Sequence, residues 1–289
     1  MKTRPLSKRA FLKLSAASAA ACALSAPARL LAETDASSKK KIPVALQLYT
    51  VRKECANDLD GTLAAVGKMG YQAVEFADYF GRDAKQLRKL LDETGLKCCG
   101  THLYLETLMG DELAKSIEFS QILGNRFLIV RTMPGKYSKT RQGWLDAAVA
   151  MNGIAEKLQP HGMRVGFHNH NTEFKPLEGE LPEDLLFGHT QKDVFIQFDT
   201  CNAMEGGGDP VVYLKRYPGR VASMHVKPFS IAKPNALLGD DELPWAEIFQ
   251  LCETIGGTEW YVIEYEKDLY PPLVVAQKTL EVMRRWGKC

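Results

Sequence analysis

The chain has 289 residues, of which 45% are hydrophobic and 25% are charged, so it is long enough to bury a large core and its composition does not suggest disorder. The formal net charge is +2, but residues 1–32 hold six of the 37 basic residues and none of the 35 acidic ones. The remainder therefore has 31 basic and 35 acidic residues, a charge of −4. A mildly acidic body argues against broad nucleic-acid binding.

Residues 1–32 have the layout of an export signal peptide. A basic start precedes a run rich in Ala, Leu and Ser that is too short for a stable membrane anchor, and small residues suited to cleavage follow. The stretch SKRAFLK at 7–13 resembles a twin-arginine leader with Lys in place of the first Arg, and an ordinary secretory leader is the alternative. We expect an exported, periplasmic protein with a flexible polar linker at 33–41, a folded domain at 42–289 and no stable membrane span once the leader is removed.

From residue 42 onward, short apolar or β-branched runs alternate eight times with longer amphipathic stretches. The predicted strands are 44–49, 73–76, 97–102, 127–131, 164–168, 194–199, 221–226 and 260–264. The predicted helices are 58–68, 83–94, 111–123, 141–159, 182–189, 210–217, 245–255 and 271–285. Glycines suited to left-handed helix caps follow several of these helices, at positions 70, 95, 124, 162 and 256. Eight strand–helix units in about 240 residues predict an α/β fold, the (β/α)₈ TIM barrel, with a doubly wound sheet as the alternative.

Polar residues stand at the C-terminal end of every predicted strand, which is where such a barrel builds its active site. The first four strands end near Gln47, Tyr49 and Arg52, then Glu75, His102 and Arg131. The last four end in pairs of residues two apart, namely His168 and His170, Gln197 and Asp199, His225 and Lys227, and Glu264 and Glu266. Residues two apart on a strand share a face, so these side chains are predicted to converge.

Charged or imidazole groups at the end of apolar strands are costly unless they are solvated, paired or metal-bound. For a single residue, a solvated strand end or an ion pair is the simpler explanation. Four consecutive strands that end this way favour a shared site. Two carboxylates with one or two imidazoles suit one divalent ion such as Mn²⁺, Co²⁺, Zn²⁺ or Mg²⁺.

Several short motifs occur in order along the chain. They are HNHNTEF at 168–174, DTCN at 199–202, RVASMHVK at 220–227 and YVIE at 261–264, with QLYTVR at 47–52 and GDDELPW at 239–245 beside them. Together they resemble the sugar phosphate isomerase/epimerase family of xylose isomerase-like TIM barrels, over residues 42–286. The resemblance implies one divalent ion whose ligands, carried over by position, are His168, Asp199, His225 and Glu264. Many members have Glu on strand five, so Glu173 folded back toward the ion is the alternative ligand.

The same resemblance implies an enzyme that isomerises or epimerises a keto-sugar, or a derivative of one, through an enediolate. Glu264 and Glu173 are the candidate bases, and His170 and Lys227 would bind or protonate substrate oxygens. The candidate contacts to substrate, or to the residues that hold it, are Tyr49, Arg52, Glu75, His102 and Glu266.

Two other functions stay open at this point. The pattern HNHxxEF resembles proteins that process 3-keto-glycosides, in which the same enolisation would drive β-elimination and cleave a glycosidic bond. A non-catalytic sugar-binding barrel is the second alternative. A related branch cleaves abasic DNA with zinc ions, but Asn202 stands where that branch has a second-metal His, and the acidic charge opposes DNA binding. We therefore expect a small carbohydrate partner and no nucleic acid, while the oligomeric state is not indicated.

Overall fold

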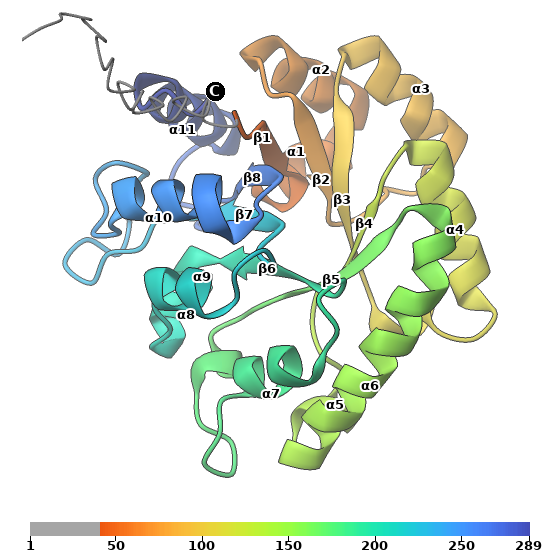
Figure 1. Cartoon of the computed structure of the whole chain (residues 1–289). Coiled ribbons are helices and arrows are strands. Elements are labelled where there is room, and N and C mark those ends of the chain that lie inside the picture. The colour runs from red at the N-terminus through yellow and green to blue at the C-terminus, as the bar shows by residue number, and fades with distance from the viewer. Residues whose placement is uncertain (1–40) are drawn as a thin grey trace, which may run out of the picture. The chain divides into compact units, whose positions relative to one another are not determined.

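Eight parallel strands close into a barrel in the computed structural model, which describes residues 41–289 (Figure 1). The strands are β1 (Val44–Gln47), β2 (Ala73–Phe76), β3 (Lys97–Leu103), β4 (Phe127–Val130), β5 (Arg164–His168), β6 (Phe195–Asp199), β7 (Ser223–Val226) and β8 (Trp260–Ile263). Each strand pairs with the next, and β8 pairs with β1. The TIM barrel prediction is confirmed and the open sheet is excluded. The predicted leader and almost all of the linker lie outside the described residues.

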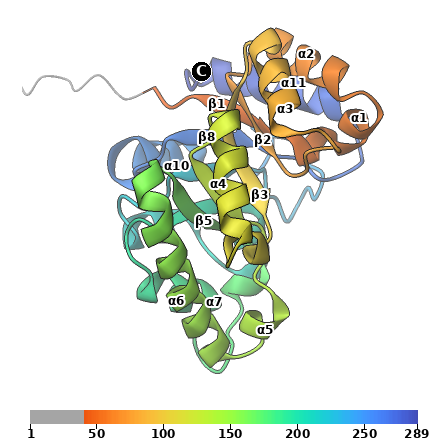
Figure 2. The same ribbon diagram turned by 90° about the vertical axis from the view of Figure 1, so that its right-hand side faces the viewer.

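Helices surround the strands, and all eight that the sequence predicts are present with ends shifted by a few residues at most (Figure 2). They are α2 (Leu59–Met69), α3 (Ala84–Thr94), α4 (Glu112–Leu123), α6 (Arg141–Leu158), α7 (Pro182–His189), α9 (Pro210–Arg216), α10 (Trp245–Leu251) and α11 (Pro272–Arg285). Three shorter helices were not predicted, namely α1 (Arg52–Asn57), α5 (Gly135–Ser138) and α8 (Thr200–Gly206). Within residues 41–289, no helix combines the length and the apolar character needed to cross a membrane.

The last predicted glycine cap is displaced by one residue. Helix α10 does not stop at a simple cap but continues into a π-helical segment, η5 (Cys252–Gly256). The wider turn moves the left-handed position to Gly257, whose φ is 74°, and a Cβ there would lie 2.7 Å from the carbonyl oxygen of Gly219. The other four predicted caps are confirmed, at Gly70, Gly95, Gly124 and Gly162.

The interior of the barrel changes from apolar to polar along its axis. Small apolar groups fill the inner face early on several strands, including Ala45, Ala73 and Val262. Two residues further along those three strands, on the same face, stand Gln47, Glu75 and Glu264. On β5, Gly166 leaves room for the ring of Phe195, because a Cβ at Gly166 would lie 2.4 Å from that ring. The strand period thus places a polar layer directly above a packed apolar one.

Candidate metal centre

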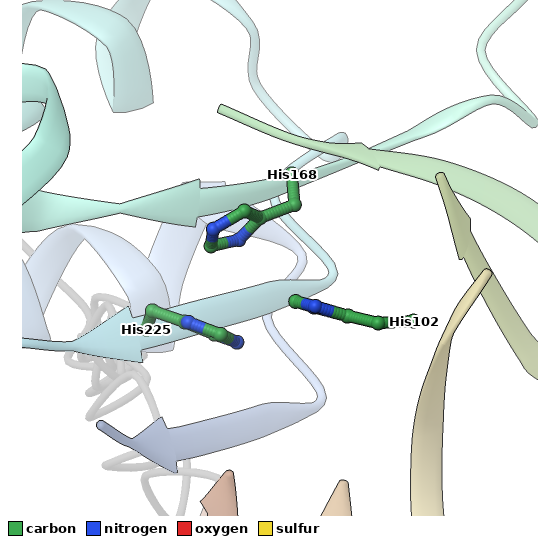
Figure 3. Close-up of side chains that lie close together, drawn as sticks. All are labelled: His102, His168 and His225. Carbon is green, nitrogen blue, oxygen red and sulfur yellow. The ribbon is translucent and has the colours of Figure 1, made fainter. Parts of the chain in front are cut away.

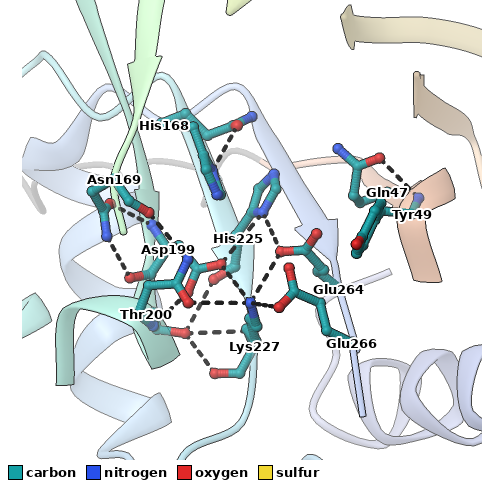
Figure 4. A network of polar contacts seen from close by, with 12 residues as sticks. Gln47, Tyr49, His168, Asn169, Asp199, Thr200, His225, Lys227, Glu264 and Glu266 are labelled. Atoms are coloured by element: carbon teal, nitrogen blue, oxygen red, sulfur yellow. Dashed lines mark hydrogen bonds and ion pairs between the residues drawn. The ribbon is translucent and has the colours of Figure 1, made fainter. Parts of the chain in front are cut away.

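Four buried residues meet at the C-terminal ends of β5 to β8. One ligand atom from each of His168, Asp199, His225 and Glu264 lies within 4.8 Å of the others (Figure 4). His168 and Asp199 end β5 and β6, Asp199 pairs with His225 in the strand register, and Glu264 directly follows β8. These are the four residues that the resemblance proposes as ligands, and the fold brings them together.

Asp199 offers the cluster an oxygen that makes no hydrogen bond to any residue in the range 41–289. Its Oδ1 accepts the backbone N–H of Asn202 at 2.7 Å and so caps α8, whereas the buried Oδ2 has no such partner. The Asn169 side chain fixes the strand end, because it accepts the Asp199 N–H at 2.8 Å and donates to the Asp199 carbonyl at 3.1 Å. A buried carboxylate oxygen without a donor is unfavourable unless a cation balances it. The donor set and this oxygen therefore fit a divalent ion.

His225 lies between two carboxylates. Its Nε2 is 2.8 Å from Glu75 Oε1, and its Nδ1 is 3.0 Å from Glu264 Oε2. Burial alone would lower the pKa of His225, but Glu75 and Glu264 raise it well above the usual value. A metal-binding histidine usually donates its second N–H to a carboxylate, which fixes the ring. Glu75 occupies that position, and Nδ1 is the nitrogen that faces Asp199 and Glu264.

His168 supplies a neutral imidazole. Burial, followed by the neighbouring His225 and His102, holds the pKa of His168 well below its usual value. Metal ligation requires this neutral form. The side chains of His102, His168 and His225 lie close together (Figure 3). The ring centroid of His168 is 4.8 Å from that of His102 and 4.8 Å from that of His225.

His102 completes a second possible group of ligands with His168 and His225. Its Nε2 is 2.6 Å from Gln197 Oε1 and 3.0 Å from Glu75 Oε1, and both of these oxygens accept hydrogen bonds. The Nε2 of His102 must therefore carry a proton, which makes it a donor here rather than a ligand.

Glu75 holds the polar layer together from a fully buried position. Its Oε1 accepts from Gln47 at 2.6 Å and from His225 and His102, and its Oε2 accepts from Gln197 at 2.6 Å. Burial raises the pKa of Glu75, but the two imidazoles outweigh it and lower the pKa to about 2. This carboxylate stays ionised with both oxygens occupied, so its position favours a supporting role over a substrate contact.

Lys227 places a cation beside two of the four cluster residues. Its Nζ lies 3.5 Å from both Asp199 Oδ2 and Glu264 Oε2, and 3.1 Å from Glu266 Oε2. Burial would lower the pKa of Lys227, but these carboxylates raise it well above the usual value. For Glu264, burial would raise the pKa, whereas Lys227 and His225 hold it well below the usual value. The site thus combines an ammonium with an ionised carboxylate.

The loop after β5 decides how Glu173 is used. Glu173 Oε2 accepts the backbone N–H of His170 at 2.7 Å, and Oε1 accepts the Thr172 hydroxyl at 3.1 Å, which closes the short helix η4 (Thr172–Phe174). Glu173 is not a member of the four-residue cluster, in which His168 holds the strand-five position. The geometry therefore favours His168 over Glu173 as the ligand, and Glu173 fixes the loop that carries His170.

Comparison with known proteins identifies the family of this barrel. The pattern that describes the xylose isomerase-like TIM barrel matches residues 63–286. The chain belongs to this family. An inosose dehydratase of Clostridium botulinum (strain Alaska E43 / Type E3) is 22% identical over 250 residues, which is 73% of this chain and 83% of that protein.

Solved structures of this family share the fold. A sugar phosphate isomerase/epimerase from Parabacteroides distasonis ATCC 8503 has a TM-score of 0.72 and 23% identity, over 87% of this chain and 96% of that one. An L-ribulose 3-epimerase has a TM-score of 0.61 and 17% identity, over 86% of this chain and 97% of that one. The resemblance drawn from the motifs is confirmed.

The remaining predicted contacts of this family member lie at the rim. Tyr49 is 37% exposed, and the Arg52 guanidinium lies 4.5 Å from the centre of its ring. Arg52 also pairs with Asp268 at 3.1 Å, so its charge is shared with a rim carboxylate. Glu266 follows β8, and burial together with Glu264 raises its pKa. None of these side chains belongs to the four-residue cluster.

Two residues of the polar layer received no role from the sequence. Gln197 hydrogen-bonds Glu75, His102, His168 and Ser223, and Asn169 holds the end of β6. The strand period did place Gln197 on the face of Asp199. Its role depends on Glu75, 122 positions away, which a local pattern does not reveal.

Proposed function

We propose that this protein is a divalent-metal-dependent enzyme that removes the proton next to the carbonyl of a cyclic keto-sugar or keto-polyol and then eliminates a β-substituent. The observation that carries the proposal is the buried cluster of His168, Asp199, His225 and Glu264, in which Asp199 Oδ2 makes no hydrogen bond within residues 41–289 and lies 3.5 Å from the Lys227 ammonium. A bound divalent ion would polarise the carbonyl and stabilise the negative charge that develops on its oxygen.

The residues around the cluster divide the proton transfers between a base and an acid. Glu264 is ionised, so it accepts the proton as the C–H bond breaks and its electrons form the C=C bond. The β C–O bond then breaks, and Lys227 gives a proton to the departing oxygen, which becomes water when the substituent is a hydroxyl. A departing hydroxide is a stronger base than an amine, so even the raised pKa of Lys227 permits this transfer.

Two features favour elimination over epimerisation. Epimerisation needs a second proton donor on the opposite face of the carbon, and here strand five supplies the neutral His168 instead of a carboxylate. Lys227 and Glu266 also line a small cavity of about 60 Å³, which has room for a small leaving group such as water. The name of the inosose dehydratase relative describes the same class of reaction.

Epimerisation is the second candidate, and His170 is the residue that supports it. Its ring lies 5.0 Å from that of His168, on the β5 side of the site, and burial lowers its pKa. A neutral imidazole there would exchange a proton with the face opposite Glu264. Cleavage of a 3-keto-glycoside would use the same elimination with a larger leaving group.

The test is NMR of product mixtures in D₂O, with keto-polyols, keto-sugars and 3-keto-glycosides offered to the purified protein and Mn²⁺ or Co²⁺. Elimination predicts an unsaturated product and a released water or aglycone, and chelation should abolish it until metal is restored. Deuterium uptake without bond scission would indicate epimerisation. A fully active metal-free preparation would refute the metal mechanism, and binding without turnover over hours would favour a sugar-binding barrel.

A further inference from the structure

The side-chain amide of Gln197 connects both sides of the polar layer. It is fully buried on β6, and its Oε1 lies 3.1 Å from His168 Nδ1 and 2.6 Å from His102 Nε2. Its Nε2 lies 2.6 Å from Glu75 Oε2 and 3.0 Å from the Ser223 hydroxyl. The amide of Gln197 thus contacts the candidate ligand His168 directly. It also contacts Glu75, the carboxylate that hydrogen-bonds a second candidate ligand, His225.

The two ends of this amide are not interchangeable. Glu75 Oε1 lies within hydrogen-bond distance of the Gln47 amide and of both the His225 and His102 rings, so this carboxyl group acts as an acceptor, and the NH₂ group of Gln197 faces its Oε2. The amide oxygen is then left facing His168, and an oxygen of this kind only accepts hydrogen bonds. His168 Nδ1 must therefore carry the hydrogen. A neutral imidazole has one N–H, so its Nε2 keeps the lone pair that a cation requires.

We propose that Gln197 is a positioning residue that selects the Nδ1–H tautomer of His168 and so directs the Nε2 lone pair to the cluster. The selection begins at Glu75, which orients the amide and, through its other oxygen, also holds His225 Nε2. The functional meaning of this inference rests on the proposed metal centre. The tautomer itself is a property of the protein without metal, so the two ideas can fail separately.

Gln47 provides a matched control. It is also fully buried, and its Nε2 donates to Glu75 Oε1 at 2.6 Å. Its amide oxygen accepts the Tyr49 N–H at 3.1 Å, and within the described chain it hydrogen-bonds no histidine. Gln47→Met and Gln197→Met therefore each remove one buried amide from the same carboxylate, but only the second removes the acceptor for His168.

The first measurement is long-range ¹H–¹⁵N NMR of metal-free protein labelled at its six histidines, with the His168 signals assigned from a His168→Ala spectrum. Wild type and Gln47→Met should show His168 as the Nδ1–H tautomer. Gln197→Met should shift His168 toward the Nε2–H tautomer. Gln197→Glu keeps an acceptor beside Nδ1, so it should keep the wild-type tautomer even though it loses the donor to Glu75.

The second measurement is the affinity for Zn²⁺ or Co²⁺ by competition with a chelator. Gln197→Met should weaken binding by about 10–100-fold, the usual effect of removing a hydrogen-bond partner of a metal-binding histidine, and Gln47→Met should weaken it less. An Nε2–H tautomer in the wild type, or an unchanged tautomer in Gln197→Met, would overturn the inference. If Gln197→Met does not fold, the wild type and Gln197→Glu decide it. If the tautomers are as expected but the protein binds no metal, the proposed function is contradicted. The role of Gln197 in selecting the tautomer then still stands.

Discussion

The two halves of the barrel contribute different kinds of residue to the site. All four candidate ligands come from β5 to β8, whereas β1 to β3 supply Gln47, Glu75 and His102, which hydrogen-bond to each other or to the ligands. Two buried carboxylates illustrate the difference. Glu75 has donors on both oxygens, while Asp199 Oδ2 makes no hydrogen bond to any residue from 41 to 289.

This difference shows that burial alone does not identify a metal ligand. A buried acceptor without a partner costs about 1–3 kcal/mol, so the fold tolerates one only where something else balances it. We interpret Gln47, Glu75 and His102 as supports whose polar atoms pair with each other or with the ligands, and Asp199 Oδ2 as the atom that a divalent ion would bind. Substitutions in each half should therefore have effects of different size.

The largest effect is expected in the second half. Asp199→Ala and Glu264→Ala should each lose the bound ion and lower turnover by about 10³-fold or more, because several kcal/mol of transition-state stabilisation disappear. Metal analysis by mass spectrometry and turnover of the keto-substrate measure both. Either variant retaining stoichiometric metal would contradict the assigned ligand set.

The next largest effect distinguishes His168 from Glu173, the two alternatives for the metal ligand that strand five supplies. His168→Ala should lose metal, since it removes a ligand, while Glu173→Gln should keep it because glutamine still accepts the His170 N–H. Titration with Co²⁺, followed by its absorbance, compares the two. Metal loss in Glu173→Gln with binding intact in His168→Ala would reverse the assignment.

A smaller effect is expected in the supporting half. Glu75→Gln replaces an acceptor by an amide that still fills the space, so His225 loses its negative partner but the barrel keeps its packing. Metal affinity should fall by about 10–100-fold, the range found when a carboxylate behind a metal-binding histidine is removed. Affinity unchanged from wild type would mean that β1 to β3 do not support the ligands.

The same residues show which parts of the fold and of the site the sequence predicts. The alternation of strands and helices predicts the barrel, and the two-residue period predicts that His168, Asp199, His225 and Glu264 converge. The family resemblance named the four candidate ligands, but the hydrogen bonds by which Glu75 and Gln197 support them were not predictable, because they depend on which strands become neighbours across the barrel. Glu75 meets His225 across 150 positions, and that contact exists only once the sheet has closed. The sequence also ranked epimerisation first, whereas the acid–base arrangement leads us to propose elimination.

The smallest effect concerns another buried carboxyl group, which lies on a helix outside the strand barrel. Glu183 on α7 is fully buried, and neither of its oxygens is hydrogen-bonded to the described part of the chain. Burial, followed by Glu173 and Asp184, raises its pKa well above 4.5. The folded protein thus holds this proton more tightly than the unfolded chain, so the contribution of Glu183 to stability is fully present below pH 4.5 and is lost as the pH rises through its raised pKa.

Glu183→Gln removes this titration and should gain about 1–3 kcal/mol at neutral pH, with a smaller gain in acid. Urea unfolding of both proteins, once at neutral pH and once below the usual carboxyl pKa, measures the difference in their free energies of unfolding. Metal affinity serves as the control and should not change. An equal effect at both pH values would show that the carboxyl is not the cause.

Closure of the barrel also links the site to the folding reaction. Strand β8 pairs with β1 at Ala45 and Val262 and at Leu46 and Ile263, immediately before Gln47 and Glu264. The last ligand therefore reaches the cluster only when the two ends of the folded chain have met, and such high-contact-order pairings are slow to form. An ion at 100 times its dissociation constant would stabilise the closed state by about 2.7 kcal/mol. Metal supply would then raise the fraction of chains with a closed barrel as well as allow turnover of the substrate.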